Sequence, residues 1–341
     1  MRTKTKKPHK KESGSILEPQ YRDEDAAREH LEKLRWPDGP ECPHCGLVGE
    51  AYKITVKEKT FEEIKATKKR IRKPRKGLWK CAGCRKQFTV TVKTIFEDTH
   101  IPLHKCLLAV HLMCSSKKGI SAHQLMRNLD IGSYKTAWFL AHRIRHAMTE
   151  GAPDVKLSGI VEADETYIGG RRRFHQPHAV KVGERPQDRP SPVADKAAVF
   201  SVVQRGGKVY SRHIERVTAE NLTDVLNEVC EQDAHLMTDT GALKGIGKQR
   251  KHSLVNHSAD EYVRYDDGVC VTTNTVEGYF SLLKRGINGI YHHVGRKHLH
   301  RYLAEFDFRY NARETTDGQR SVNAIKTIEG KRLMYKDPVG N

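Results

Sequence analysis

The sequence predicts an α/β domain in its second half, preceded by a small metal-binding β-module and a helical region. Three observations lead to this order. Two Cys-x-x-Cys pairs lie in the first hundred residues, apolar positions recur at helical spacing between residues 103 and 148, and short apolar strands alternate with helical segments after residue 158. A chain of 341 residues is long enough for two domains or one elaborate one.

Charge is distributed unevenly along the chain. The 61 Lys and Arg exceed the 42 Asp and Glu by 19, and residues 1–150 contribute 32 minus 17, or +15, of that excess. Clustered cations favour a polyanionic partner, because each phosphate that they neutralise releases counterions. A merely soluble basic surface is the alternative. Residues 1–20, which are basic and poor in apolar side chains, are predicted to be a disordered tail.

No segment of the sequence predicts membrane insertion. The longest mostly apolar run, Cys106 to Cys114, has nine residues, whereas a membrane span needs about 20. The first fifteen residues lack the apolar stretch of a secretory signal. We therefore expect a cytoplasmic protein without a membrane partner. Its eight cysteines are then metal ligands or buried thiols rather than disulfides.

The first folded module, over residues 21–93, is predicted to be a zinc ribbon with a leading helix at Asp23–Leu34. Two Cys-x-x-Cys knuckles separated by 35 residues can turn four thiolates onto one tetrahedral Zn(II). Four unligated core cysteines would be the alternative. Strands are expected at residues 51–56, 77–80 and 87–92. The predicted zinc ligands are Cys42, Cys45, Cys81 and Cys84.

The segment between the two knuckles is strongly basic. Eight of the twelve residues from Lys65 to Lys76 are Lys or Arg, so this loop repels itself unless it is solvated or lies on phosphates. We predict DNA contacts here and keep a solvated loop as the alternative. The candidate contacts are Lys68, Lys69, Arg70 and Arg72.

Residues 94–150 are predicted to form a helical DNA-binding region. Leu103–Gly119 is expected to be one apolar helix, and two more follow, the second beginning after a Ser133 cap. Their short Gly-containing turn, with basic residues beside the apolar face of the second helix, is typical of a helix-turn-helix. The candidate DNA contacts are Lys135, Arg143 and Arg145.

The domain predicted over residues 158–312 begins after a break at residues 151–154. Three strands, a helix, a strand and then further helices give an α/β order that resembles ribonuclease H. The expected strands cover residues 158–170, 196–204, 208–216, 234–240 and 252–257, and the expected helices cover 218–230 and 274–287. Residues 171–192 are expected to be an inserted polar loop, and residues 313–341 a weakly ordered C-terminal tail.

Three acids fall where such a sheet would bring carboxylates to one point. Asp164 lies in the first strand, Asp239 ends a strand of buried residues, and Glu277 lies one turn into a helix. Carboxylates suit hard ions such as Mg(II) or Mn(II), and two such ions can clamp the attacking and leaving oxygens of a phosphoryl transfer. The neighbours Glu162 and Glu165 leave the choice of strand acid open. Any of these acids could instead be an ordinary edge or solvated residue.

Two basic residues follow Glu277 on the same helix. Lys284 lies seven residues, or two turns, after Glu277, so both side chains project from one face. Lys284 could then hold a DNA phosphate while Glu277 holds metal, and its neighbour Arg285 is a further candidate contact.

Several stretches of the sequence, taken together and in order, resemble the zinc-ribbon insertion-sequence transposases of the ISXO2-like family. They are CPHCG, RWPDG, KCAGCRKQFTVTVKTIFEDTHIPL, SYKTAWFLAHRIRHAM, VEADETYIGG, TNTVEGYFSLLKRGINGIYHHV and HLHRYLAEFDFRYNAR. The resemblance covers residues 23–313. It implies a DDE-type domain of ribonuclease H fold, with the triad on Asp164, Asp239 and Glu277 and with Lys284 as the accompanying base. Asn274 matches the family's Asn-x-x-Glu pattern and is a rival third ligand.

The resemblance also implies an activity: cleavage of transposon ends and transfer of their 3′-hydroxyl groups to target DNA, assisted by two Mg(II) or Mn(II) ions. The implied partners are double-stranded DNA and at least one further copy of the chain, since two ends must be coupled, with the protein associated with the nucleoid. Two alternatives stay open. One is a catalytically inactive DNA-binding regulator, and the other is a ribonuclease H-like structure-specific nuclease.

Overall fold

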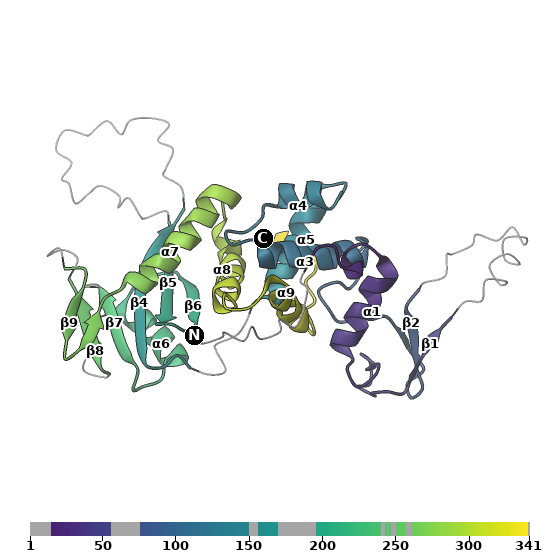
Figure 1. Cartoon of the computed structure of the whole chain (residues 1–341), viewed down its shortest axis with the longest axis horizontal. Coiled ribbons are helices and arrows are strands. Elements are labelled where there is room, and N and C mark those ends of the chain that lie inside the picture. The colour runs from purple at the N-terminus through teal and green to yellow at the C-terminus, as the bar shows by residue number, and fades with distance from the viewer. Residues whose placement is uncertain are drawn as a thin grey trace, which may run out of the picture. The chain divides into compact units, whose positions relative to one another are not determined.

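Figure 1 presents a computed structural model of the chain that describes residues 15–55, 76–149, 156–169, 196–239, 243, 245, 246, 250–256 and 261–339. The chain forms two compact units. The first contains the described residues up to Ser115, then Ala122–Ala147 and the residues from Thr315 onward, and the second contains Ser116–Ser121 and Met148–Glu314. Among the described residues, no helix has the length and apolar character needed to cross a bilayer.

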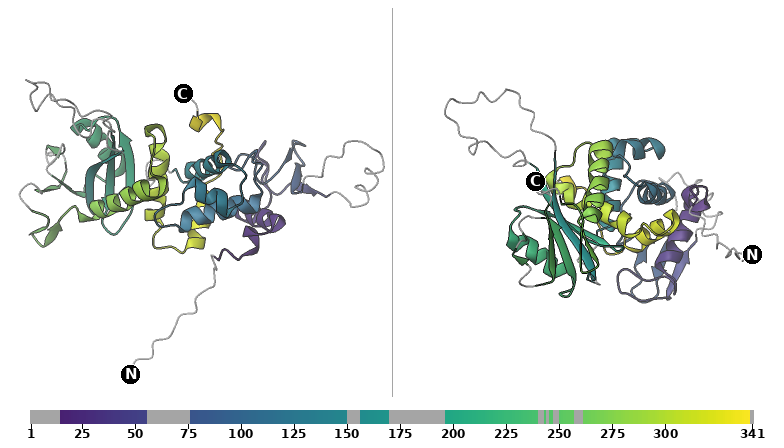
Figure 2. Two further views of the ribbon diagram at one scale, coloured as in Figure 1. Left: turned by 90° about the horizontal axis from the view of Figure 1, so that it is seen from above. Right: turned by 60° about the vertical axis from the view of Figure 1, so that its left-hand side comes forward.

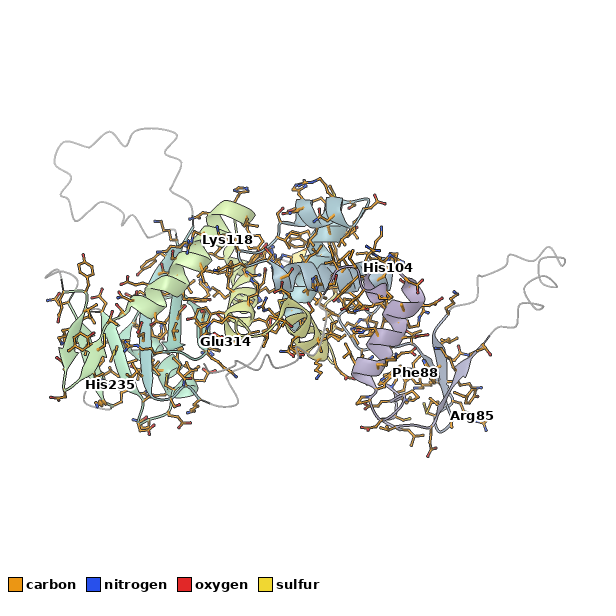
Figure 3. The ribbon with its side chains drawn as sticks, in the orientation of Figure 1. Arg85, Phe88, His104, Lys118, His235 and Glu314 are labelled. Carbon is orange, nitrogen blue, oxygen red and sulfur yellow. The ribbon has the colours of Figure 1, made fainter. Side chains whose placement is uncertain are left out.

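The first unit begins with a helix packed on a small antiparallel sheet. The Asp23 carboxylate accepts a 2.8 Å hydrogen bond from the Ala26 N–H and so caps the helix where the sequence predicts its start. At the other end, Trp36 meets Phe88 of the sheet edge-on, with ring centroids 5.8 Å apart (Phe88 is labelled in Figure 3). The elements are η1 (Pro19–Tyr21), α1 (Glu24–Arg35), β1 (Ala51–Ile54), β2 (Leu78–Cys81) and β3 (Gln87–Phe88), with sheet order β1–β2–β3.

The third strand is shorter than the predicted 87–92. Beyond Phe88 the chain turns: the Val92 N–H donates to the Thr89 carbonyl, and the Thr94 hydroxyl donates to the Thr91 carbonyl at 2.7 Å. Threonine alternating with valine has a high strand propensity, but threonine hydroxyls also offer local partners to the backbone. The turn forms here because those local bonds are made.

Helices make up the rest of the first unit. The first of them ends at Ser115, four residues before the predicted end at Gly119, because the Ser116 hydroxyl donates to the Gly119 carbonyl at 2.6 Å and closes a turn. The Ser133 side chain accepts from the Thr136 N–H at 3.4 Å, in line with its predicted capping role. The helices are α3 (Leu103–Ser115), α4 (Ala122–Asn128), α5 (Tyr134–Ala147), α9 (Asp317–Lys326) and α10 (Lys336–Val339).

The prediction of a weakly ordered tail over residues 313–341 is wrong for its described part. The Thr316 side chain caps α9 by accepting from the Gln319 N–H. From α9, Arg320 donates to the Cys114 carbonyl at 2.9 Å, and the Ser321 hydroxyl lies 3.2 Å from His111 Nδ1. Both partners belong to α3. This helix contains few apolar residues, so the sequence shows no clear helical pattern there. Polar contacts to the distant helix α3 stabilise much of it.

The second unit is built on a five-stranded mixed sheet of order β6–β5–β4–β7–β8 (Figure 1). β6, β5 and β4 pair antiparallel, whereas β4, β7 and β8 pair parallel. The strands are β4 (Ile160–Ile168), β5 (Ala197–Gln204), β6 (Val209–Ile214), β7 (His235–Asp239) and β8 (His252–Val255). The sequence predicts all five, because alternating or continuously apolar strands bounded by turn residues are a strong signal.

Helices cover both faces of this sheet. Leu222 and Leu226 of α6 pack on one face with Val161 and Ala163, while Val276 and other apolar residues of α7 pack on the opposite face with α8. The right-hand view of Figure 2 shows the sheet between these helices. The helices are α6 (Ala219–Val229), capped by Thr218, α7 (Asn274–Gly286) and α8 (Arg296–Asn311), with a π-helical turn, η5 (Ile287–Tyr291), between the last two.

A short hairpin that the sequence does not predict precedes α7. It consists of β9 (Arg264–Asp266) and β10 (Val269–Val271). Asp267 adopts a left-handed backbone at its turn, with φ of 47°, and Gly268 follows with φ of 77°. Asp-Gly is a strong hairpin signal when apolar runs flank it, but here the preceding strand is polar.

Candidate active site and metal centre

The two Cys-x-x-Cys knuckles meet in the first unit. Cys42 Sγ lies 3.6 Å from Cys84 Sγ, and Cys45 Sγ lies 3.6 Å from Cys81 Sγ. All four sulfur atoms lie within 4.8 Å of one another. Zn–S bonds of about 2.3 Å place the sulfurs of a tetrahedral site about 3.8 Å apart. The predicted ligand set is therefore brought together at a spacing that fits structural zinc.

The backbone of the two knuckles favours metal binding by these thiols. The residue after each second cysteine, Gly46 or Arg85, has a left-handed backbone with φ of 76° or 58°, which turns each knuckle back on itself (Arg85 in Figure 3). Although burial raises the pKa of the Cys42 thiol, hydrogen bonds from the backbone of His44 and Cys45 lower it to about 7. A thiolate is the form that binds zinc.

The second unit brings the predicted carboxylates together through strand register. β4 and β7 pair in parallel, with Ala163 opposite Thr238. One residue further on, this register sets Asp164, in the middle of β4, beside Asp239, the last residue of β7, on neighbouring strands about 4.8 Å apart. The side chain of Asp164 shares the sheet face that α7 covers, because it alternates with Val161 and Ala163, which face α6. Glu277 lies on α7, at its first turn.

The electrostatics also indicate that these acids are close. The pKa of Asp164 is raised to about 7, mainly by burial and also by the charges of Glu165, Asp239 and Glu277, against the lowering effect of a hydrogen bond from the Glu165 N–H. Like charges this close disfavour ionisation until a cation neutralises them. Carboxylate oxygens of this kind are the ligands that Mg(II) and Mn(II) prefer. The donor set therefore fits a hard divalent ion.

The carboxylates are less tightly gathered than the thiols. Within the described ranges, the four cysteines are the one group of three or more His, Cys, Asp or Glu side chains whose ligand atoms approach closely enough to share an ion. Glu277 is exposed, and Asp164 and Asp239 are partly exposed.

The three acids of β4, among which the sequence leaves the choice open, have different surroundings. Glu162 is fully buried, and its carboxylate accepts hydrogen bonds from Arg205 and from the first turn of α7. Glu165 lies on the opposite face from Asp164 by strand alternation. Of the two acids of β4 on the face that α7 covers, Asp164 is therefore the one without such a structural role.

The remaining candidates on α7 are all exposed. Asn274 begins the helix and lies one turn before Glu277, while Lys284 and Arg285 belong to its last turn. The Arg285 side chain donates back to the Ser281 carbonyl at 3.0 Å. Basic residues at a helix C-terminus are favoured by the helix dipole, and both remain accessible to a phosphate.

Because the pKa of Asp164 is raised to about 7, we expect the protein without added divalent ions to lose stability as pH rises from about 4 to 7. In that window the folded chain holds a proton that the unfolded chain releases, so the free energy of unfolding falls with rising pH. Asp164→Asn should flatten this slope in urea denaturation series, whereas Asp224→Asn, at an exposed acid of α6, should not. An unchanged slope in Asp164→Asn would contradict the raised pKa.

The prediction is wrong for two of the DNA contacts on α5, because their side chains are buried. Arg143 is 8% exposed and Arg145 is 2% exposed, so neither side chain is available to a DNA surface. The Arg143 guanidinium lies 4.6 Å from the centre of the Phe139 ring, and burial lowers its pKa. Long basic side chains bury their stems readily, which periodicity alone does not reveal. Lys135 is exposed.

The other predicted basic contacts lie outside the described residues. These are Lys68, Lys69, Arg70 and Arg72, within residues 56–75. The predicted N-terminal tail up to residue 14, the break at 151–154 and the inserted loop at 171–192 also lie there.

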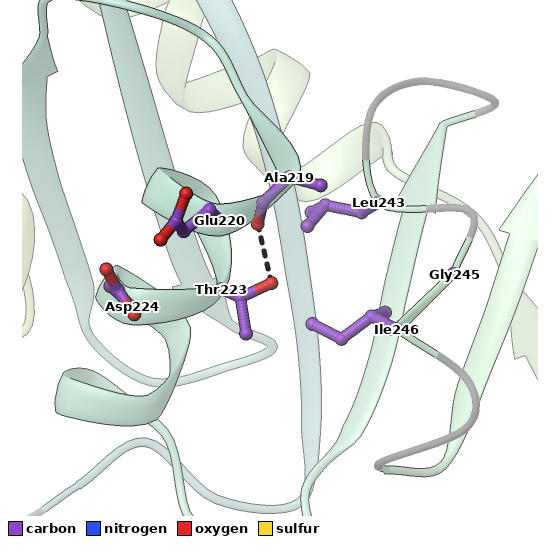
Figure 4. A pocket seen from close by; sticks show the side chains of 7 residues that line it. All are labelled: Ala219, Glu220, Thr223, Asp224, Leu243, Gly245 and Ile246. Carbon is purple, nitrogen blue, oxygen red and sulfur yellow. Dashed lines mark hydrogen bonds between the residues drawn. The ribbon is translucent and has the colours of Figure 1, made fainter.

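A pocket of about 340 Å³ lies beside the first turns of α6 (Figure 4). Glu220 and Asp224 line it together with Leu243 and Ile246, and none of the described residues that line it is basic. Two carboxylates would repel a nucleic-acid phosphate. None of the predicted site residues contributes to this pocket, so it is not the candidate active site.

Comparison with known proteins matches both units to one family. Residues 156–311 match the ISXO2-like transposase domain, and residues 22–87 match the transposase zinc-ribbon domain. An uncharacterized protein in transposable element ISH50 of Halobacterium salinarum is 27% identical over 287 residues, which cover 82% of this chain and 88% of that protein.

Among solved structures, a chain from the cryo-EM structure of the simian T-cell lymphotropic virus intasome in complex with PP2A regulatory subunit B56 gamma matches 60% of this chain. The match spans 65% of that chain, with 12% identity and a TM-score of 0.27, a likeness too low to bear on fold or function. The two domain matches, in the same order as the motifs of the sequence, confirm the predicted resemblance. The chain therefore combines an ISXO2-like transposase domain with a transposase zinc-ribbon domain at its N-terminal side.

Proposed function

We propose that this chain is an active DNA transposase that cleaves transposon ends and joins them to target DNA through a ribonuclease H-like DDE domain. The observation that supports this best is the strand register that sets Asp164 beside Asp239 under the helix that carries Glu277. A sheet with an antiparallel half, β6–β5–β4, and a parallel half, β4–β7–β8, supports the ribonuclease H-like assignment.

Each carboxylate then has a role in metal binding. Asp164 and Asp239 would flank two divalent ions, and Glu277 would complete the second site, with Asn274 as its rival. When bound, Mg(II) or Mn(II) would stabilise charge on the attacking and leaving oxygens of an in-line displacement. Lys284 and Arg285, both exposed on the same helix, would hold DNA phosphates and so orient the strand.

Two displacements at phosphorus suffice for the whole reaction. In the first, water attacks the phosphodiester at the transposon end, and the bond to the 3′ oxygen breaks, leaving a 3′ hydroxyl and a 5′ phosphate. In the second, that hydroxyl attacks a target phosphodiester and displaces another 3′ oxygen. No covalent protein–DNA intermediate is needed, and coupling two ends requires at least two copies of the chain.

DNA recognition would fall to the first unit. The helices α4 and α5, joined by a short turn, support a helix-turn-helix, with Lys135 exposed near the start of the second helix. The zinc ribbon and the basic residues between its knuckles would add contacts to the phosphate backbone.

We expect the basic segment to supply mainly nonspecific affinity. Replacing Lys68, Lys69, Arg70 and Arg72 by Gln should reduce the salt dependence of DNA binding, by a slope of about 0.9 for each DNA phosphate that these side chains no longer neutralise. Fluorescence anisotropy of one DNA duplex at several salt concentrations measures this slope. An unchanged slope would mean that the segment is a solvated loop.

Incubating the protein with Mg(II), DNA that carries the sequences flanking its gene, and a target plasmid tests the proposed function. A transposase produces 3′-hydroxyl ends and joins them to the plasmid. A regulator without catalytic activity binds the ends but leaves them intact, and a structure-specific nuclease cuts branched DNA without joining it. Either of those outcomes would overturn the proposal.

A further inference from the structure

The carboxylate of Glu162, two residues before Asp164 on β4, joins the sheet to the start of α7. The side chain is 0% exposed. Its Oε2 accepts from the N–H groups of Thr275 at 2.6 Å and of Val276 at 3.1 Å. Its Oε1 accepts from the Thr275 hydroxyl at 2.8 Å and from Arg205 Nε and Nη2 at 3.0 and 2.8 Å.

Five donors saturate this carboxylate. A carboxylate offers about four lone-pair directions, so Glu162 has none left for a metal ion. Its place in the sheet nevertheless ties it to the candidate site, since Asp164 shares its face two residues further along β4. Glu162 is therefore a structural neighbour of the metal ligands rather than one of them.

The two N–H groups that donate hydrogen bonds to Glu162 belong to the first turn of α7, where backbone donors lack partners within the helix. Thr273, at the capping position, makes no capping hydrogen bond through its side chain. Glu162 takes over that role from a strand more than a hundred residues earlier. Its negative charge also suits the positive end of the helix dipole.

Arg205 completes this arrangement. Besides Glu162, its guanidinium donates to the carbonyl of Cys270 at 2.9 Å and to that of Thr272 at 3.3 Å. Those carbonyls lie on β10 and in the link from β10 to α7. Arg205 thus both balances the buried charge of Glu162 and holds the chain that leads into the helix.

We propose that Glu162 and Arg205 act as a positioning pair that sets Glu277 against Asp164. Glu162 fixes the first turn of α7 to the strand of Asp164, and Glu277 follows within that turn. A displaced helix would move one carboxylate while the other two stayed in place on the sheet. This inference rests on the proposed function, which assigns the three carboxylates to the metal ions.

Glu162→Gln tests the pair. A Gln amide has one acceptor oxygen, so either orientation turns its NH2 group toward at least two of the five donors. In metal-free protein, hydrogen exchange at the N–H groups of Thr275 and Val276 should accelerate about tenfold or more. In cleavage assays, the Mn(II) concentration for half-maximal rate should rise about 10- to 100-fold, as for other residues that orient metal ligands.

A milder variant tests the pair even if Glu162→Gln fails to fold. Thr275→Val keeps the shape of the side chain and both N–H bonds but removes the hydroxyl donor to Glu162. It should produce smaller changes in both measurements, in the same direction. Wild-type exchange in Glu162→Gln, or accelerated exchange with an unchanged Mn(II) requirement, would overturn the inference.

Leu222→Ala provides the matched control. Leu222 is fully buried on the opposite face of the sheet, so its truncation should lower the melting temperature without touching α7. At a temperature where it is folded, the control should keep the wild-type Mn(II) requirement. If Leu222→Ala raises the Mn(II) requirement as much as Glu162→Gln does, the effect is one of general stability and the inference fails. Should Asp239→Asn stay active, the proposed function fails instead, while the exchange result still reports on the pair.

Discussion

Replacing Asp239 by Asn should abolish both DNA cleavage and strand transfer while DNA binding persists. Asp239 ends β7, and the register with β4 sets it beside Asp164. The amide keeps the shape of the side chain but removes a charge that divalent ions require. Metal ions contribute several kcal/mol of transition-state stabilisation, so we expect the rate of both steps to fall by about a thousandfold or more.

The same variant should fold normally. Without added divalent ions its stability should match the wild type or rise slightly, because removing one of several neighbouring negative charges relieves repulsion. Gel assays of cleavage and joining, together with urea denaturation, measure these effects, with Asp224→Asn as the control acid outside the site. The role of Asp239 is falsified if the variant joins ends at a near wild-type rate or is inactive only because it unfolds.

Replacing Cys81 by Ser should release the zinc and unfold the ribbon over residues 41–93. Cys81 Sγ lies 3.6 Å from Cys45 Sγ and is buried in the four-sulfur cluster. Thiolate ligation supplies folding free energy on the order of 10 kcal/mol in isolated zinc fingers, so a three-thiol site should fail to hold the module. Metal analysis measures the zinc that remains bound, and limited proteolysis reports the unfolding of the ribbon.

Cys270→Ser is the control for this experiment, since Cys270 is partly exposed on β10 and lies outside the cluster. It should keep one zinc per chain and give the wild-type pattern of fragments in limited proteolysis. The second unit should keep its own unfolding transition in both variants. One zinc per chain in Cys81→Ser would contradict the four-cysteine assignment.

Local signals carried much of the fold. The five strands of the second unit, the Asp23 and Thr218 caps and the start of α7 all follow from residues close together in the chain. The zinc ligands followed from spacing alone, because two Cys-x-x-Cys pairs can turn four thiolates onto one tetrahedral Zn(II). Strand alternation also reduced the candidate acids of β4 from three to two, since it puts Glu162 and Asp164 on one face and Glu165 on the other.

The sequence by itself therefore determined the order of elements, the zinc cluster and a short set of candidate acids, since each depends on propensity, periodicity or spacing within one segment. Only the tertiary structure shows that Glu162 is buried and fully hydrogen-bonded while Asp164 is partly exposed, and that Arg143 and Arg145 are buried. It also packs the described part of the C-terminal segment on α3. Those outcomes depend on donors, rings and carbonyls from residues far away in the chain. Whether a charged side chain binds metal, meets DNA or supports a helix depends on those distant partners.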